Sequence, residues 1–412
     1  MSTYTFNESM ALFKRATHVI PSGIYGHMTP SITVPGSFPY YALKGRGCRY
    51  WDVDGNEFID YMCAYGPMVV GYNNPRVDEA ARKQMEEGNC LNHPGRIMVE
   101  LAEYLVDLIP MGDWAVFAKN GSDLTTWALQ VAREFTKRSK IAMVKGTYHG
   151  AHAWCTPGHG GLIEEDRSRI LKFQWNDADS LRELVQSNKG EIAGVIMTPF
   201  HHPAFGDCVM PKEGFWNDIR SICDEDGILL ILDDVRAGFR LHMGGSNEYF
   251  GFRPDLTVFC KAIANGYPIS AALGRKDLKS AAANVFLTGS YWNSAVPMAA
   301  SMATIQELKR TDGIGQMAAM GTRLMKGLEE GAREQGMELV CSGPPSIPFM
   351  RFADESDFMR QQVFCAETSK RGVFFHPHHN WFLSAAHTET DIDETLDVAE
   401  QAFKVVKEKF GS

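Results

Sequence analysis

Two apolar runs of the kind that forms buried strands end in residues that could do chemistry. The run "ILLILD" (228–233) ends in Asp233, and the run "LTVFCK" (256–261) ends in Lys261. Lysine is rarely buried without a specific task. Burial lowers the pKa of its amine and frees the amine to attack a carbonyl group. Aspartate alone would be an ordinary turn residue, but the pair indicates a reactive site at the end of a sheet.

A third run, "WAVFAK" (114–119), is followed by Asn120-Gly121-Ser122 at the start of a predicted helix. The first N–H groups of a helix have no partner within it. Together with the helix dipole and the Ser122 hydroxyl they can bind a phosphate. Plain capping by Asn120 or Ser122 is the alternative interpretation of the same residues. The pattern is not a P-loop, because GxxxxGK[ST] is absent.

The pattern of the whole chain predicts how these residues are positioned. Short apolar runs alternate with amphipathic helical stretches from about residue 71, which is typical of a mostly parallel sheet covered on both faces. The runs are 114–119, 141–145, 193–198, 228–233, 256–261 and 268–274. Ligands bind beyond the carboxyl ends of such strands. There the segment "GTYHG" (146–150) offers Tyr148 as a surface on which a planar ligand could stack, although a surface turn would look similar.

The two chain ends differ from this central part. Asp54-Gly55 predicts a hairpin within residues 48–62, and Thr390 is expected to cap a last helix. We therefore expect residues 1–70 and 316–412 to form one smaller domain, with residues 71–315 as the large domain.

Composition excludes several classes of protein. The 412 residues include 44% hydrophobic and 22% charged residues, as in ordinary globular proteins. The net charge of −9 gives no reason to expect nucleic acid or an anionic membrane as a partner. No secretory signal or membrane span is recognisable. The nine scattered cysteines indicate reduced thiols and a cytoplasmic protein.

A phosphate site, an aromatic shelf, an acid and a lysine at one sheet edge are what pyridoxal 5′-phosphate (PLP) requires. Lys261 would form the Schiff base, and Asp233 would keep the pyridine nitrogen protonated. An ion pair at about 4 Å is worth roughly 4 kcal/mol at an effective dielectric of 20, enough to fix the protonation state of the ring.

These residues, in this order, resemble the class III aminotransferases of PLP fold type I, and in particular the glutamate-1-semialdehyde 2,1-aminomutases. The resemblance runs along nearly the whole chain, through "YWDVDGNEFIDYM", "YGPMVVGYNNP", "NGSD", "YHG", "LDDVRAGFR", "CKAIANGYPISA" and "AHTETDI". It implies an α/β fold: an aspartate aminotransferase-like large domain with a mostly parallel sheet, and a small α+β domain from both chain ends.

The resemblance also implies a role for individual residues. Lys261 is the Schiff-base lysine and Asp233 the pyridinium partner. Tyr148 lies on the ring, and Gly121 and Ser122 hold the phosphate. A further residue, Ser290, stands where the family usually has a threonine that binds the phosphate of the neighbouring subunit, which implies a homodimer with shared active sites.

Departures from the family pattern bear on the substrate. Thr29 stands where the aminomutases carry an arginine for the substrate carboxylate, and residues 16–43 contain no lysine or arginine. The family's usual Asp-Glu is Asp233-Asp234, so a shorter acid is expected beside the cofactor. We therefore expect little conversion of glutamate semialdehyde to 5-aminolevulinate, because a bidentate contact to the carboxylate is missing. The expected substrate contacts are His27, Thr29, Tyr65, His201, His202, Arg236, His378 and His379.

The histidines allow three interpretations. His376, His378 and His379, with His201 or His202, could bind zinc, but no HExxH helix or cysteine pair accompanies them. They could instead form hydrogen bonds with substrate hydroxyls or a carboxylate, or lie at the rim of the site without a function. We expect substrate contacts and no metal.

The leading hypothesis is a PLP-dependent aminotransferase that moves an amino group from an amino donor to a ketone or aldehyde. The acceptor is expected to be polar and non-standard, from secondary metabolism. One alternative is an intramolecular aminomutase or an epimerase, which would share every catalytic residue. Alternatives of another class are a histidine-site metal hydrolase and a non-catalytic α/β binding protein.

Overall fold

The computed structural model describes residues 3–26, 33–203 and 205–411, and the chain divides into two compact units. The large unit consists of residues 75–203 and 209–310. The small unit combines residues 1–74, 204–208 and 311–412. The boundaries expected from the sequence were after residues 70 and 315, and the two units divide after residues 74 and 310. Nothing in the sequence indicated that the segment 204–208 belongs to the small unit.

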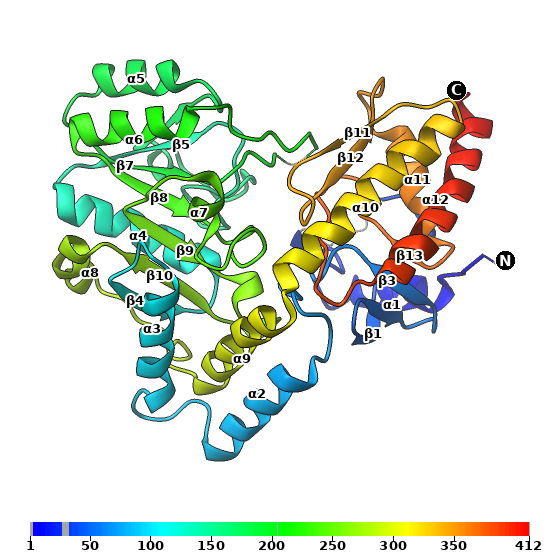
Figure 1. Ribbon diagram of the computed structural model, residues 1–412, viewed down its shortest axis with the longest axis horizontal. Helices are drawn as coiled ribbons and strands as arrows, with labels where there is room; N and C mark the ends of the chain where they lie inside the picture. The colour runs from blue at the N-terminus through cyan, green and yellow to red at the C-terminus, as the bar shows by residue number, and fades with distance from the viewer. Residues whose placement is uncertain (1–2, 27–32, 204, 412) are drawn as a thin grey trace. The chain divides into compact units, whose positions relative to one another are not determined.

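A seven-stranded sheet forms the centre of the large unit, in the order β4-β10-β9-β8-β7-β5-β6 (Figure 1). Its strands are β4 (Trp114–Ala118), β5 (Lys140–Val144), β6 (Ile170–Phe173), β7 (Ile192–Met197), β8 (Leu229–Asp233), β9 (Leu256–Phe259) and β10 (Ser270–Gly274). In this sheet of the described residues, β10 alone runs opposite to the other six strands. The predicted mostly parallel sheet is therefore confirmed, with β6 as an additional edge strand.

Helices cover both faces of this sheet, which explains why its strands are continuous apolar runs rather than alternating ones. The helices of the large unit are α2 (Pro75–Glu87), α3 (Arg96–Leu108), α4 (Gly121–Thr136), α5 (Ala178–Ser187), α6 (Phe215–Asp226), α7 (Ser246–Phe250), α8 (Lys279–Asn284) and α9 (Ala295–Thr311). Ile231 of β8 packs in one core with α4 and α8, whereas Leu230 and Leu232 pack in a second core with α5 and α6 (Figure 1).

The direction of the strands determines where the site lies. β4, β5, β7, β8 and β9 all point the same way, so their carboxyl ends share one edge of the sheet. The residues that the sequence singled out follow the strands at this edge. The loops at this edge can contact a ligand, whereas the strands themselves are buried between helices.

The small unit contains a four-stranded sheet in the order β1-β2-β3-β13 and a two-stranded hairpin. Its elements are α1 (Asn7–Ala16), β1 (Ala42–Arg46), β2 (Arg49–Asp52), β3 (Glu57–Asp60), α10 (Gly313–Glu334), β11 (Leu339–Ser342), β12 (Phe349–Phe352), α11 (Met359–Ser369), β13 (Val373–Phe374) and α12 (Glu389–Phe410). The hairpin predicted at Asp54-Gly55 is confirmed by the antiparallel pairing of β2 and β3.

One predicted cap was wrong by two residues. Thr388, not Thr390, caps α12, because its hydroxyl accepts the Asp391 N–H at 3.3 Å while the Asp391 carboxylate accepts the Thr388 N–H at 2.9 Å. This reciprocal arrangement satisfies two N–H groups at once, which a cap at Thr390 would not do. Among the helices of the described residues, none is long and apolar enough to span a bilayer.

Candidate active site

Lys261 follows β9 in an unusual backbone conformation. Its φ is +49°, in the left-handed region, where a residue with a side chain is strained. Such strain tends to concentrate at functional sites. Burial, and next the positive charge of Arg236, lower the pKa of the Lys261 amine to about 8. About a tenth of this amine is therefore neutral, and nucleophilic, at pH 7.

Asp233 ends β8 with a buried carboxylate that is 5% exposed. The carboxylate accepts hydrogen bonds from His149 Nδ1 at 2.7 Å and from the Val235 N–H at 3.2 Å. Within the described residues, no lysine or arginine lies within ion-pair distance of it. A buried carboxylate without a cation is costly, so the site is suited to a ligand that brings a positive charge.

The start of α4 lies against the ends of β8 and β9. A Cβ on Gly121 would lie 2.9 Å from both methyl groups of Val235, so only glycine allows this close approach. The Gly121 N–H reaches the Cys260 thiol, next to Lys261. Asn120 is the N-cap residue of α4, one of the two caps that the alternative interpretation offered, and Asp123 accepts its N–H at 2.8 Å.

The "GTYHG" segment is held against the same helix. The Ser122 hydroxyl accepts the Ala151 N–H at 3.0 Å, and a Cβ on Gly150 would lie 2.4 Å from that hydroxyl. Burial raises the pKa of Tyr148, and the charges of Arg236 and Asp233 also act on it. Tyr148 therefore lies within electrostatic range of Asp233.

These contacts bring the lysine, the acid, the helix start and the aromatic residue to one edge of the sheet. The arrangement fits PLP, which carries a pyridine nitrogen for Asp233, a phosphate for the start of α4 and an aldehyde for Lys261. A neutral cofactor would not supply the cation that the buried Asp233 carboxylate lacks. Fold and site together indicate a PLP-dependent enzyme of fold type I.

The sequence led us to expect the Asp234 carboxylate beside the cofactor, and the structure differs. This carboxylate does not face the cofactor site but accepts hydrogen bonds from the Ser246 N–H at 2.8 Å and the Ser246 hydroxyl at 2.5 Å. Asp234 therefore anchors the start of α7. Burial raises its pKa to about 7, because the two Ser246 donors offset the loss of water only partly.

Three further residues of the large unit were predicted to contact the substrate or the phosphate, namely His201, His202 and Ser290. His201 stacks on Trp175 at 5.9 Å, its Nδ1 is 3.4 Å from the Thr147 hydroxyl, and burial lowers its pKa. His202 is buried and packs edge-on against Phe200 at 5.2 Å. Ser290 is exposed.

Tyr65, His378 and His379 belong to the small unit, whereas His27 and Thr29 lie outside the described residues. The Tyr65 ring lies 5.3 Å from His379, and His378 Nε2 is 2.5 Å from the Gln362 amide. His378 is buried, with 8% of its surface exposed.

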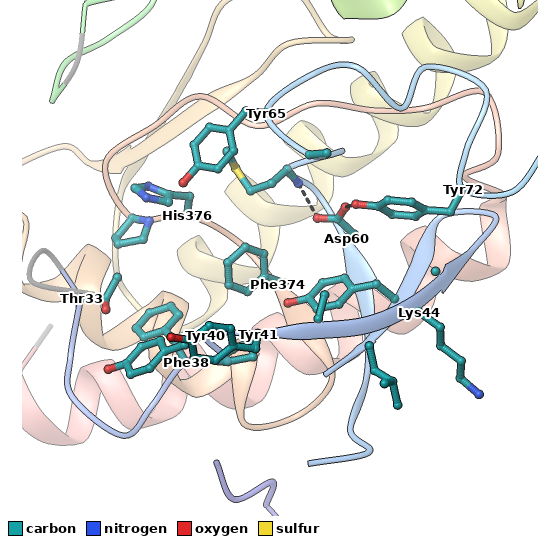
Figure 2. Close-up of a pocket in the computed structure, with 18 residues that line it drawn as sticks. Thr33, Phe38, Tyr40, Tyr41, Lys44, Asp60, Tyr65, Tyr72, Phe374 and His376 are labelled. Atoms are coloured by element: carbon teal, nitrogen blue, oxygen red, sulfur yellow. Dashed lines mark hydrogen bonds between the residues drawn. The ribbon is translucent and has the colours of Figure 1, made fainter. Parts of the chain in front are cut away.

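Figure 2 shows Tyr65 and His376 on the wall of a pocket of about 430 Å³ in this unit, lined largely by aromatic side chains. Tyr65 is held by a strained turn, since Cys63, Ala64 and Tyr65 all have positive φ. Asp60 stabilises this turn by accepting the N–H groups of Met62 and Cys63 at 2.8 and 3.0 Å. Burial raises the pKa of Asp60 to about 6.

In the described part of the chain, no three His, Cys, Asp or Glu side chains are grouped as metal ligands. One residue with a contact to the site received no role from the sequence, namely His149. The motif "GTYHG" pointed to its segment, but the pairing with Asp233 joins residues 84 positions apart and is visible only in the fold.

Comparison with known proteins identifies the family. The family model of class-III aminotransferases matches residues 33–403. An aminopentol aminotransferase of Sphingopyxis macrogoltabida is 43% identical over 401 residues, which cover 97% of this chain and 95% of that protein. A glutamate-1-semialdehyde 2,1-aminomutase of Acetivibrio thermocellus is 33% identical over 421 residues, with 95% and 97% covered.

Similarity to a solved structure agrees with this family. The PLP internal aldimine form of the Sphingopyxis sp. MTA144 FumI protein matches with a TM-score of 0.97 and 43% identity, over 98% of both chains. The chain therefore belongs to the class-III aminotransferase family. It is an aminotransferase whose cofactor is PLP, and the family resemblance read from the sequence is confirmed.

Proposed function

We propose that the chain transfers an amino group between a hydroxylated amine and a carbonyl acceptor, with Lys261 and Asp233 as its catalytic residues. The observation that carries this proposal is their placement at the ends of the paired strands β9 and β8. A lysine whose pKa is about 8 and a buried carboxylate without a cationic partner are what the reaction needs from the protein.

Each residue has a defined task in this proposal. PLP, when bound, withdraws electrons from the substrate carbon that carries the nitrogen. Lys261 holds the cofactor through its amine and, as a neutral base, moves the proton at that carbon. Asp233 keeps the ring nitrogen protonated. Tyr148 lies against the ring, and Gly121 and Ser122 bind the phosphate.

We also propose a homodimer in which Ser290 binds the phosphate of the neighbouring subunit. Support comes from the family resemblance and from the exposure of Ser290, which leaves its hydroxyl accessible to a second chain. All nine cysteines are free thiols, which supports a cytoplasmic location.

The substrate is proposed from the relative and from the composition of the chain. The name of the 43% identical relative describes an amine with five hydroxyl groups. No lysine or arginine lies within residues 16–43, so an arginine for a substrate carboxylate is missing from this segment. Histidines and tyrosines are suited to hydroxyl groups, which both donate and accept hydrogen bonds.

The proposed contacts to such a substrate are His27, Thr29, Tyr65, His201, His202, Arg236, His378 and His379. Arg236 has support of its own, because its charge acts on both Lys261 and Tyr148. It could bind an anionic group of the substrate or of the cofactor. A polar ketone or aldehyde of secondary metabolism is the proposed acceptor.

A half-reaction screen tests the proposal. The visible spectrum of the PLP-loaded protein is followed while hydroxylated amines and ordinary α-amino acids are added one at a time, and Lys261→Ala serves as the inactive comparison. We expect hydroxylated amines to convert the cofactor fastest, with Lys261→Ala folded but inactive. A response to α-amino acids alone, or a preference for pyruvate over hydroxylated ketones as acceptor, would contradict the substrate assignment.

A second arm separates the transaminase from the aminomutase that the 33% identical relative represents. Glutamate semialdehyde is supplied without any other amino donor or acceptor, and 5-aminolevulinate is measured. We expect little product, and efficient turnover would establish an intramolecular reaction instead.

A further inference from the structure

A buried imidazole lies directly behind the proposed pyridinium partner. His149 Nδ1 is 2.7 Å from Asp233 Oδ2, and the two side chains are 0% and 6% exposed. We propose that His149 is a positioning residue that keeps Asp233 ionised and fixes the orientation of its carboxylate. This inference rests on the role of Asp233 in the proposed function.

The contacts of the imidazole determine where its proton lies. An ionised carboxylate oxygen only accepts hydrogen bonds, so the proton of the short contact belongs to Nδ1. Nε2 is also buried and has no hydrogen-bond partner among the described residues. A second proton on Nε2 would leave a buried N–H without an acceptor, which is costly. His149 is therefore neutral, with its proton on Nδ1.

The surroundings of His149 prevent it from turning away. Its ring stacks on Trp154 with the ring centres 6.1 Å apart and the planes at 18°. The Thr125 hydroxyl donates to the His149 carbonyl at 2.9 Å, and the Trp154 Nε1–H donates to the Thr126 hydroxyl at 2.8 Å. Both the ring and the backbone of His149 are thus held by the first two turns of α4.

Other ionisable groups also act on Asp233, but none of them forms a hydrogen bond with its carboxylate in the described structure. They come from several elements and are Lys261 after β9, Asp234 in the same loop, and Tyr148 and Cys155 beyond β5. Among the described residues, only the backbone N–H of Val235 and the imidazole of His149 donate to it. His149 is therefore the side chain that can orient this carboxylate.

The hydrogen bond has a chemical consequence. A donor to a carboxylate stabilises the ionised form, so a proton shared between Asp233 and the cofactor ring lies on the ring nitrogen. Without this donor the proton moves toward Asp233, and the ring withdraws electrons less strongly. Hydrogen-bond partners of metal ligands, which orient a directly contacting group in the same way, typically change affinity or activity by about 10- to 100-fold.

The test compares two substitutions of His149, one that removes the hydrogen-bond donor to Asp233 and one that keeps a donor. His149→Phe keeps an aromatic ring for Trp154 but removes the N–H, whereas His149→Asn retains a donor close to the position of Nδ1. His159 is exposed and lies in the same unit, so His159→Phe and His159→Asn are matched controls. The first readout is the ¹⁵N chemical shift of ring-labelled PLP in each holoenzyme, which reports protonation of the ring nitrogen.

We expect His149→Phe to lower the pH at which the ring nitrogen loses its proton by about one to two units, a 10- to 100-fold change in that equilibrium. His149→Asn should largely restore it, and the His159 variants should match the wild type. In the apoprotein, the ¹⁵N spectrum of His149 should show protonated Nδ1 and unprotonated Nε2. Equal ring protonation in wild type and His149→Phe, or a proton on Nε2, would overturn the proposal.

Asp233→Asn separates this inference from the proposed function. If Asp233→Asn leaves the ring nitrogen protonated as in the wild type, the proposed role of Asp233 itself fails. If Asp233→Asn abolishes protonation while His149→Phe does not, only the role of His149 fails. Should His149→Phe not fold, the comparison of His149→Asn with His149→Gln decides, because glutamine places its amide nearer to Nε2 than to Nδ1. In that comparison, equal protonation in the two variants would overturn the proposal.

Discussion

At the scale of single residues, the chemistry depends on the surroundings of two side chains, Lys261 and Asp233. Lys261 is kept partly neutral by burial and by Arg236. Asp233 is buried with a histidine, not a lysine or arginine, at ion-pair distance in the described structure. The two side chains suit the same ligand, since a partly neutral amine and a buried carboxylate without a lysine or arginine partner fit a cofactor that supplies an aldehyde and a cation.

The pKa of Lys261 predicts how covalent attachment of PLP depends on pH. Only the neutral amine reacts, so attachment should accelerate as pH rises through about 8. About a tenth of the amine is neutral at pH 7 and about nine tenths at pH 9, whereas an ordinary lysine, with a pKa of about 10.4, is still almost fully charged at pH 8.

Borohydride trapping measures this dependence. Apoprotein is mixed with PLP at pH 6 to 10, reduced after short intervals and digested, and modification at residue 261 is quantified by mass spectrometry. Lys279, on the surface helix α8, is the internal control in the same digest. A rate at Lys261 that follows the same pH profile as the rate at Lys279 would show that the site does not activate this amine.

Single residues also show which contacts could not be predicted from the sequence. Asp233, Lys261, Gly121, Ser122 and Tyr148 could be singled out because each follows a recognisable apolar run. His149 could not be assigned, because its partner Asp233 lies on β8 and β7 separates that strand from β5 in the sheet. The direction of the Asp234 side chain was likewise wrong, since nothing local indicates Ser246 as its partner.

At the scale of elements, the central sheet was predictable and its edges were not. Strands buried on both faces have continuous apolar runs, and five of the predicted runs became parallel strands. The edge strand β6 has only four residues, of which only the last is fully buried and the third is an exposed lysine, so it lacks this pattern. The strained turn at Cys63–Tyr65 was also hidden, because non-glycine residues rarely adopt positive φ.

The start of α4 yields a prediction about packing between elements. Gly121→Ala adds a methyl group 2.9 Å from both methyl groups of Val235, so the helix start must move away from β8. We expect cofactor affinity to fall about tenfold or more, because the phosphate-binding N–H groups move with the helix. Equilibrium dialysis of the apoprotein with PLP measures the affinity.

Two further variants make this prediction specific. Gly160→Ala adds the same methyl group where no atom lies within 4 Å, and it should leave affinity unchanged. Val235→Ala combined with Gly121→Ala restores the space, so the double variant should bind PLP better than Gly121→Ala alone. An affinity of Gly121→Ala equal to that of wild type would show that the start of α4 does not hold the phosphate.

At the scale of the whole molecule, the question is whether one chain is a complete enzyme. Lys261, Asp233, Gly121 and Tyr148 are joined by contacts within the large unit, whereas Ser290 is exposed and joined to none of them in the described structure. The proposal gives Ser290 the phosphate of another copy, because the family resemblance places the corresponding threonine at the phosphate of the neighbouring subunit. The proposed homodimer therefore predicts that active sites combine residues of two chains.

Mixing two inactive variants tests this prediction. Lys261→Ala removes the lysine, and Ser290→Asp places a negative charge where the phosphate of the other chain is expected. In a dimer of one chain of each kind, one site combines an intact Lys261 with an intact Ser290, while the other site carries both changes. Unfolding and refolding an equal mixture gives hybrids in about half of the dimers, so about a quarter of wild-type activity should return. Sites built within single chains would give no recovery, because every chain in the mixture carries one of the two changes.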